Sequence, residues 1–369
     1  MKLLRALFAL AVFFTLSASY VRAQQTSPPA PPVGPPASIP LPDASGAPPQ
    51  QSQSSAPPDE KQQDQKQQAP TIVVPTTMVR LVATVMDRHH GFVTDLNQKD
   101  FKVVEDGQPQ DIRYFTRETD LPLRIGLLLD TSNSIRPRLQ FEQDAAIDFL
   151  TSVVRRNKDM AFLMTFDNEP EVIQDFTGDL SYLVDAIHKQ RAGGGTALND
   201  AIFMASQKLA NAPLPKGASQ DIRRVLVVIS DGDDNLSDHA ISEALESAIR
   251  AEVSIYSVST NTDWLAVDDE TKPQKYHLDP GDKVLQQFAD ESGGRVFYPY
   301  KIDDLAQSFL DIGIELRSQY FIAYAPTNVV MNGAYRRVEV DTDHKGLIVR
   351  TRKGYYANAS GSTQAPVTK

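Results

Sequence analysis

Short apolar runs alternate with amphipathic helical patterns through the middle of the chain, and this alternation restricts the possible folds more than any other feature. Four runs have the length and composition of buried strands: residues 124–129, 160–166, 225–229 and 253–258. One helix is indicated by apolar residues at helical spacing, namely Ala146, Phe149, Leu150 and Val153, and five more by similar patterns at 180–190, 198–210, 240–251, 283–291 and 304–316. The alternation predicts an α/β fold with a doubly wound, mostly parallel sheet and helices on both faces.

Strand patterns rich in valine and threonine flank this region on both sides. Before it lie residues 78–86, 101–105 and 112–115, with Asp106-Gly107 as a hairpin turn that leads into the last of them. After it lie residues 319–325, 335–341 and 347–352. Three strands alone make a marginal sheet, so we expect the segments 76–120 and 319–357 to pair in one small β-sandwich-like domain. The α/β domain, residues 121–318, is then an insert.

The ends of the chain have a different composition. Lys2 and Arg5, an apolar run over residues 7–16 and the sequence Val21-Arg22-Ala23 predict a cleaved secretory signal peptide at residues 1–23. An uncleaved N-terminal membrane anchor is the alternative, because residues 3–18 fall only slightly short of the ~20 apolar residues that span a bilayer. Residues 24–75 are rich in Pro and Gln and predict a disordered linker, and residues 358–369 a disordered tail. We therefore expect a secreted or periplasmic protein that is not inserted in a membrane after cleavage.

Composition removes several classes of function. The chain has no cysteine, which excludes disulfides, thiolate metal sites and a Cys nucleophile. A net charge of −10 disfavours nucleic acid and anionic membranes as partners. The nucleophile elbow GxSxG, the zinc motif HExxH, the phosphate-binding P-loop and the dinucleotide motif GxGxxG are all missing from the sequence. We therefore predict that the protein is not an enzyme.

Three polar loops fall where ligands bind in such a fold, at the carboxyl ends of parallel strands. Asp130, Ser132 and Ser134 follow the first buried strand, Thr196 follows a run of three glycines, and Asp231 follows the strand at residues 225–229. Two carboxylates and three hydroxyls are oxygen ligands of the kind that Mg²⁺ or Mn²⁺ prefers. Because hydroxyls donate little charge, the ion is expected to stay electrophilic and to accept an Asp or Glu carboxylate from a protein partner.

At these five residues the sequence resembles the von Willebrand factor type A domain and its metal-ion-dependent adhesion site, called MIDAS. Asp130, Ser132 and Ser134 match the DxSxS signature, Thr196 the threonine element and Asp231 the final aspartate element. The resemblance covers roughly residues 121–316. The flanks, including "VTDLNQKDFKVVEDGQPQDIRYF" and "RSQYFIAYAP", resemble the VWFA-related domain proteins abundant in acidobacteria. This resemblance implies an exported protein with a metal-dependent binding face.

Several alternatives stay open at the level of sequence. The five residues could instead fill ordinary turn and helix-cap roles. The protein could be a metal-independent scaffold or assembly protein of the cell envelope, or, more distantly, a metal-assisted hydrolase. Among the neighbouring acids, Asp233, Asp234 and Asp238 are expected to form a solvated loop, with a role as secondary ion ligands as the alternative. Asp200 is expected to lie on a helix surface.

Overall fold

The computed structural model describes residues 78–117, 121–215, 222–261, 278–299 and 302–357. The predicted signal peptide (1–23), linker (24–75) and tail (358–369) lie outside these residues. Within the described ranges, no helix is both long enough and apolar enough to cross a membrane.

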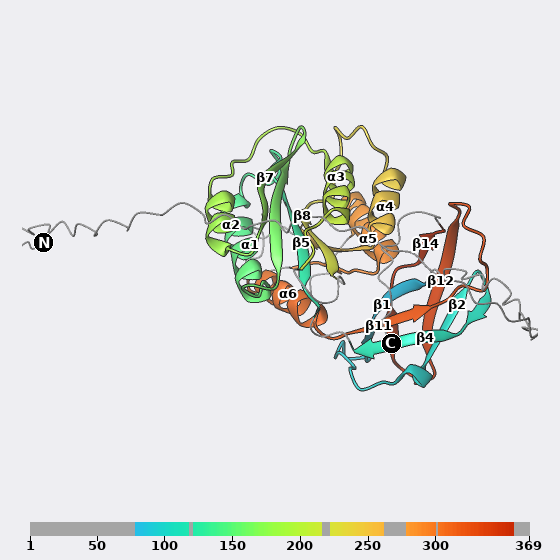
Figure 1. The fold of residues 1–369 in the computed structure, drawn as a ribbon. Coiled ribbons are helices and arrows are strands. Elements are labelled where there is room, and N and C mark those ends of the chain that lie inside the picture. The colour runs from blue at the N-terminus through green and yellow to red at the C-terminus, as the bar shows by residue number, and fades with distance from the viewer. Residues whose placement is uncertain (1–77, 118–120, 216–221, 262–277, 300–301, 358–369) are drawn as a thin grey trace, which may run out of the picture. The chain divides into compact units, whose positions relative to one another are not determined.

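The centre of the described chain is a six-stranded sheet with the strand order β10-β9-β8-β5-β6-β7 (Figure 1). Its members are β5 (Leu123–Asp130), β6 (Met160–Phe166), β7 (Pro170–Thr177), β8 (Arg223–Ser230), β9 (Val253–Ser259) and β10 (Val296–Phe297). All neighbours pair in parallel except β6 and β7, which are antiparallel. The predicted α/β fold class is confirmed.

Helices cover both faces of this sheet, as Figure 1 shows. Apolar residues of α1, α2 and α6 form a core with one face, and those of α3, α4 and α5 form a second core with the other. The helices are α1 (Leu139–Val153), α2 (Leu180–His188), α3 (Leu198–Ala210), α4 (Ile241–Arg250), α5 (Pro280–Ser292) and α6 (Ile302–Glu315). Helix α5 has Pro280 in its first turn and is followed by Gly293, which has a φ of 81°, so both ends follow the usual preferences for proline and glycine.

The two central strands are buried on both sides. Every residue of β5 is buried, and all of β8 except Arg224, which is why both appear in the sequence as continuous apolar runs without alternation. Gly126 in β5 leaves room for the second core, because a Cβ there would lie 2.6 Å from Phe162 Cζ. The sheet therefore holds its strand ends rigidly in place.

The flanking strands form two antiparallel sheets around a third core. One sheet has the order β13-β1-β11-β4 and the other the order β14-β12-β2-β3. The strands are β1 (Val79–Met86), β2 (Phe101–Glu105), β3 (Gln108–Gln110), β4 (Ile112–Arg117), β11 (Gln319–Tyr324), β12 (Tyr335–Thr342), β13 (Ile348–Arg350) and β14 (Gly354–Tyr356). We call these two sheets the β-sandwich.

Strands from the two ends of the described chain alternate within the β-sandwich. Strand β1 pairs with β11 and β13, β4 pairs with β11, and β2 pairs with β12. The chain leaves the sandwich after β4 and returns in β11, and these strands are neighbours with Arg117 opposite Tyr320. The chain therefore leaves and re-enters the sandwich at two neighbouring strands.

Two details differ from the sequence-based expectation. The Asp106-Gly107 turn leads into β3, which pairs with β2, whereas β4 belongs to the other sheet. Strand β7 was not predicted, because its residues are only partly buried or exposed and show no alternation. It forms a strand because its backbone pairs in antiparallel fashion with β6.

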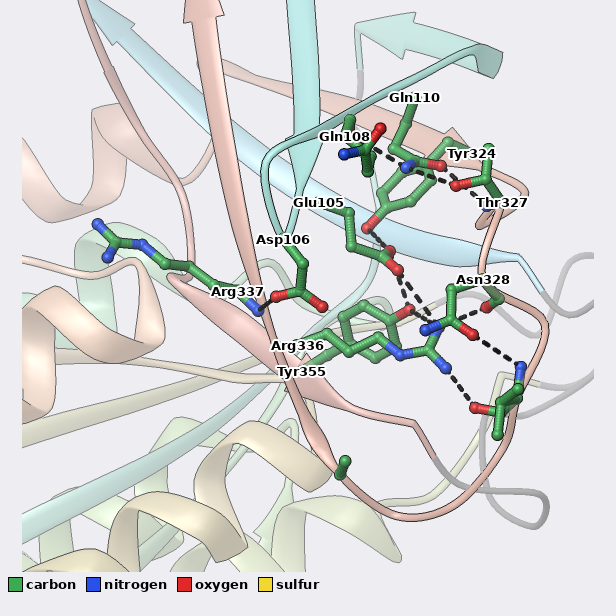
Figure 2. A network of polar contacts seen from close by, with 12 residues as sticks. Glu105, Asp106, Gln108, Gln110, Tyr324, Thr327, Asn328, Arg336, Arg337 and Tyr355 are labelled. Atoms are coloured by element: carbon green, nitrogen blue, oxygen red, sulfur yellow. Dashed lines mark hydrogen bonds and ion pairs between the residues drawn. The ribbon is translucent and has the colours of Figure 1, made fainter.

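A buried polar network joins the strands of the β-sandwich (Figure 2). The Glu105 carboxylate accepts hydrogen bonds from Tyr324 Oη at 2.7 Å, Tyr355 Oη at 3.0 Å and Arg336 Nη1 at 3.3 Å. Arg336 also donates to the carbonyl oxygens of Asn328 and Val330. The side chains of Glu105 and Arg336 are each 3% exposed, so each charge depends on the other for compensation.

We expect Arg336→Gln to destabilise the protein by about 3–5 kcal/mol, because it leaves the Glu105 carboxylate buried without its cation. The neighbouring Arg337 has a side chain that is 70% exposed, and Arg337→Gln should change the free energy of unfolding by less than about 0.5 kcal/mol. Urea unfolding of the two variants measures the difference. Equal stabilities would show that the buried pair does not hold the sandwich together.

Candidate metal centre

The candidate site lies at the carboxyl edge of the six-stranded sheet. Strands β5 and β8 pair in parallel up to Leu129 opposite Ile229, so the next residues of both strands reach the same edge. Asp130 is the last residue of β5, and Asp231 directly follows β8. Sheet topology thus brings together two carboxylates that are 101 positions apart in the sequence.

A chain of hydrogen bonds connects four of the five predicted ligands. Asp130 Oδ1 accepts from the backbone nitrogen of Ser132 at 2.8 Å. Ser132 Oγ lies 2.9 Å from Ser134 Oγ, which donates to Asp231 Oδ2 at 2.8 Å. Asp130 Oδ2 accepts from Ser230 Oγ at 2.7 Å. The side chains of both strand ends are therefore parts of one connected polar cluster.

The glycine-rich loop that carries Thr196 is fixed to both other loops by backbone contacts. Gly193 N donates to Thr131 O at 2.8 Å, and Asn133 N donates to Gly194 O at 3.2 Å. On the other side, Thr196 O accepts from the backbone nitrogens of Asn235 and Leu236. Thr196, which is 4% exposed, is held beside the cluster through its backbone.

Glycine is required where the loop after β8 meets α5. Gly232 has a φ of 80°, and a Cβ at this position would lie 2.2 Å from the carbonyl oxygen of Gly281. An L side chain would face both an unfavourable backbone conformation and a backbone clash. Gly232 thus keeps the loop pressed against the start of α5 and fixes the position of Asp231.

Negative charge accumulates around this edge. Burial, with a smaller contribution from the charge of Asp231, raises the pKa of Asp130 to about 6, although hydrogen bonds from Ser132 and Ser230 oppose the shift. Burial also raises the pKa of Glu142 to about 8, and the charge of Asp130 adds to the effect. Glu142 is 1% exposed, and neither of its carboxylate oxygens has a hydrogen-bond partner among the residues that the structure describes. A cation at the cluster would offset the repulsion between the carboxylates of Asp130, Asp231 and Glu142.

Glu142, Ser230 and Asn168 are site residues that the sequence analysis missed. Glu142 lies four residues before Ala146 on the buried stripe of α1, and this helical spacing was the available signal. Ser230 directly precedes Asp231 and binds Asp130. Asn168 Oδ1 accepts from Gly195 N at 2.9 Å, and nothing in its local sequence indicates this role.

The neighbouring acids organise loops. Asp234 Oδ2 accepts from Asn199 N at the start of α3 and from Ser237 Oγ, which is a helix-capping role. Asp200 was expected on a helix surface, but its carboxylate accepts from the backbone nitrogens of Asp238 and His239 and contacts His239 Nδ1 at 2.7 Å. Asp200 and Asp234 therefore use their carboxylates to hold the loop before α4 in position, rather than to interact only with solvent.

Two oxygen–oxygen separations in the cluster equal those between adjacent ligands of an octahedral ion. Mg²⁺ has oxygen ligands at about 2.0–2.1 Å, so adjacent ligand oxygens are separated by about 2.9 Å. The Ser132–Ser134 and Ser134–Asp231 oxygen pairs have separations of 2.9 and 2.8 Å. Within the part of the chain that the structure describes, no three Asp, Glu, His or Cys side chains gather as a metal site. Any ligand set here therefore mixes carboxylates with hydroxyls.

Comparison with protein families supports the fold. Residues 125–233 match the von Willebrand factor type A domain. The matched residues include all three loops described above. Domains of this type generally serve as non-catalytic protein-interaction modules. Comparison with the curated proteins gave no match.

Three solved structures are similar to part of the chain. The conserved hypothetical protein BatB from Bacteroides thetaiotaomicron is 15% identical, with 54% of this chain and 99% of that chain covered and a TM-score of 0.40. An aerotolerance-related membrane protein from Bacteroides fragilis is 16% identical, with coverages of 53% and 98% and a TM-score of 0.39. A von Willebrand factor type A structure from Catenulispora acidiphila is 12% identical, with coverages of 76% and 72% and a TM-score of 0.42. At these identities and TM-scores, the three similarities indicate neither a ligand nor a partner for this protein.

The raised pKa of Glu142 predicts a pH effect on stability in the absence of divalent metal. Between pH 4.5 and about 8 the folded protein holds a proton on Glu142 that the unfolded chain releases, so the stability contributed by this proton is lost as pH rises. We expect the wild type to lose stability relative to Glu142→Gln over this interval, by on the order of a few kcal/mol. Thermal unfolding in EDTA at a series of pH values measures it.

The matched control is Glu171→Gln, which changes an exposed carboxylate on β7. The difference in stability between Glu171→Gln and the wild type should stay constant across the same pH series. If the difference in stability between Glu142→Gln and the wild type were equally constant, Glu142 would not be a buried carboxyl group that binds a proton in this pH range.

Proposed function

We propose that the protein is an exported, non-enzymatic binding module that uses a MIDAS-type divalent ion to engage an Asp or Glu of a protein partner. The observation that carries this proposal is the hydrogen-bonded cluster of Asp130, Ser132, Ser134 and Asp231 at the carboxyl edge of the sheet. The match of residues 125–233 to an interaction domain supports it. Export rests on the predicted signal peptide at residues 1–23.

Asp130, Ser132, Ser134, Thr196 and Asp231 would hold Mg²⁺ or Mn²⁺. The two carboxylates would balance the charge of the ion, and the hydroxyls would add ligands without further negative charge. A bound ion would therefore stay a Lewis acid that can bind the carboxylate of a partner. Asp130 and Asp231 are buried and fix the base of the site. Asn133 and Ser134 are exposed, so the DxSxS loop is accessible to solvent. We expect a partner to approach the site from this side.

The first test is metal-linked stability. Mg²⁺ that binds only the folded state should raise the unfolding temperature, by an amount equivalent to about 2.7 kcal/mol at a concentration one hundred times the dissociation constant. In Asp130→Asn the shift should vanish. The same variant should remain folded in EDTA, because an amide still accepts from Ser132 N and removes a buried charge.

Scanning calorimetry with Mg²⁺, Mn²⁺ and EDTA provides this measurement. The exposed carboxylate change Glu171→Gln serves as the control and should keep the full metal shift. Identical unfolding temperatures in Mg²⁺ and EDTA for the wild type would contradict metal binding.

The second test separates a metal-dependent binder from a metal-independent scaffold. Thr196→Ala removes one hydroxyl at the site and should abolish the Mg²⁺-dependent part of partner capture from a cell-envelope extract. Thr151→Ala, at an exposed position of α1, should leave capture unchanged. Quantitative mass spectrometry of the captured proteins in Mg²⁺ and in EDTA provides the comparison. Equal capture by all proteins under both conditions would support the scaffold.

A further inference from the structure

The loop between β8 and α4 presents an apolar side chain beside the candidate metal centre. Residues 233–239 of this loop are Asp, Asp, Asn, Leu, Ser, Asp and His. Leu236 is the single apolar residue among them, and its exposed fraction is 48%. Isolated exposed leucines are common on protein surfaces, so exposure alone indicates nothing. What distinguishes Leu236 is the place at which the loop holds it.

Leu236 lies against the glycine-rich loop that carries Thr196. The backbone nitrogen of Leu236 donates to Thr196 O at 3.1 Å. A Cβ on Gly195 would lie 2.4 Å from Leu236 Cδ1, so the leucine side chain occupies the space that a side chain at position 195 would need. Leu236 is therefore an exposed apolar neighbour of a predicted metal ligand.

The loop is fixed on both sides of Leu236. Before it, Asn235 N donates to Thr196 O at 2.9 Å, and Asn235 Oδ1 accepts from Thr196 N at 3.0 Å. After it, His239 N donates to Asp200 Oδ1 at 2.9 Å. Because these contacts already order the loop backbone, a partner that covers Leu236 would cost the loop little further conformational entropy.

The glycine-rich loop leaves a low surface between Leu236 and the DxSxS loop. The three glycines have no side chains, and a Cβ on Gly193 would meet no atom within 4 Å. On the side of the DxSxS loop, Asn133 N donates to Gly194 O at 3.2 Å. An extended segment of a partner can therefore lie over the glycines, with one side chain at the metal centre and another on Leu236.

The charges near Leu236 restrict the type of this second side chain. Asp233 and Asp238 lie within three positions of Leu236 and are exposed, so they would repel a second carboxylate of the partner. A basic side chain would gain only exposed ion pairs, which contribute little to affinity. A large apolar side chain avoids the repulsion and, together with Leu236, removes apolar surface from water.

We propose that Leu236 is a specificity-determining residue, and that the partner carries a large apolar side chain two positions from the Asp or Glu that binds the ion. In an extended segment, side chains two positions apart lie on the same face, roughly 6–7 Å apart. The metal centre would bind the carboxylate, and Leu236 the apolar side chain. This inference rests on the proposed metal-dependent function and adds a second requirement to it.

Titration of the full chain with two peptides, followed by ligand-observed NMR in Mg²⁺ and in EDTA, tests this proposal. Both peptides have acetylated and amidated ends, and their sequences are Leu-Ala-Asp-Ala-Leu and Ser-Ala-Asp-Ala-Ser. In Mg²⁺ we expect the wild type to bind the leucine peptide about fivefold more tightly than the serine peptide, because a leucine side chain is partly buried on binding. Leu236→Ser should bind both peptides with equal affinity, and EDTA should abolish binding.

The matched control is Leu310→Ser. Leu310 lies on α6 and has the same exposed fraction of 48%, but α6 carries none of the three loops at the metal edge. This variant should keep the preference for the leucine peptide. The rise in unfolding temperature with Mg²⁺, measured for Leu236→Ser, shows that its fold and metal centre are intact.

Each other outcome contradicts a different part of the proposal. Equal binding of both peptides by the wild type in Mg²⁺ would overturn the role of Leu236 and leave the proposed function in place. A preference for leucine that persists in Leu236→Ser would overturn this role as well, because the apolar contact would then lie elsewhere. If the wild type bound neither peptide in Mg²⁺, the proposed function itself would fail, and this inference with it.

Discussion

The parallel pairing of β5 with β8 is the constraint on which the rest of the structure depends. The ladder is continuous from Leu123 opposite Arg223 to Leu129 opposite Ile229, and helices cover it on both faces. One end of the pair places Asp130 and Asp231 at the metal edge. At the other end, Arg224 near the start of β8 donates from Nε to the carbonyl oxygen of Leu209 in α3 at 2.9 Å. The candidate metal centre is thus fixed in position by a single pair of buried strands.

The fold class could be predicted because its signal is local and repeated. Strand β6 and helix α3 have the predicted bounds, since burial on one or both sides imposes a hydrophobic pattern on the sequence itself. Strand β7 carries no such pattern, because its residues are partly buried or exposed at a sheet edge. The turn at Asp106-Gly107 was recognised, but three residues of β3 were too few to show that β4 belongs to another sheet.

The candidate site was predictable to the extent that it depends on strand ends. Asp130 and Asp231 follow apolar runs, and parallel topology then requires them to meet. The partners that tune the site depend on tertiary contacts instead. Glu142 approaches Asp130 from α1, Asn168 holds the glycine loop from beyond β6, and Asp200 binds the loop before α4. Only Glu142 has a local signal, its helical spacing from Ala146 on the buried stripe of α1; the sequence around Asn168 and Asp200 does not indicate these contacts.

The central claim is that Asp130, Ser132, Ser134, Thr196 and Asp231 together form a site for a divalent ion at this edge. Crystals grown with Mn²⁺ test it directly, because the anomalous scattering of manganese locates the ion without reference to the protein. We predict one strong anomalous peak within coordination distance of Ser132 Oγ, Ser134 Oγ and an Asp231 oxygen. A manganese peak elsewhere on the α/β domain, or none at saturating Mn²⁺, would contradict it.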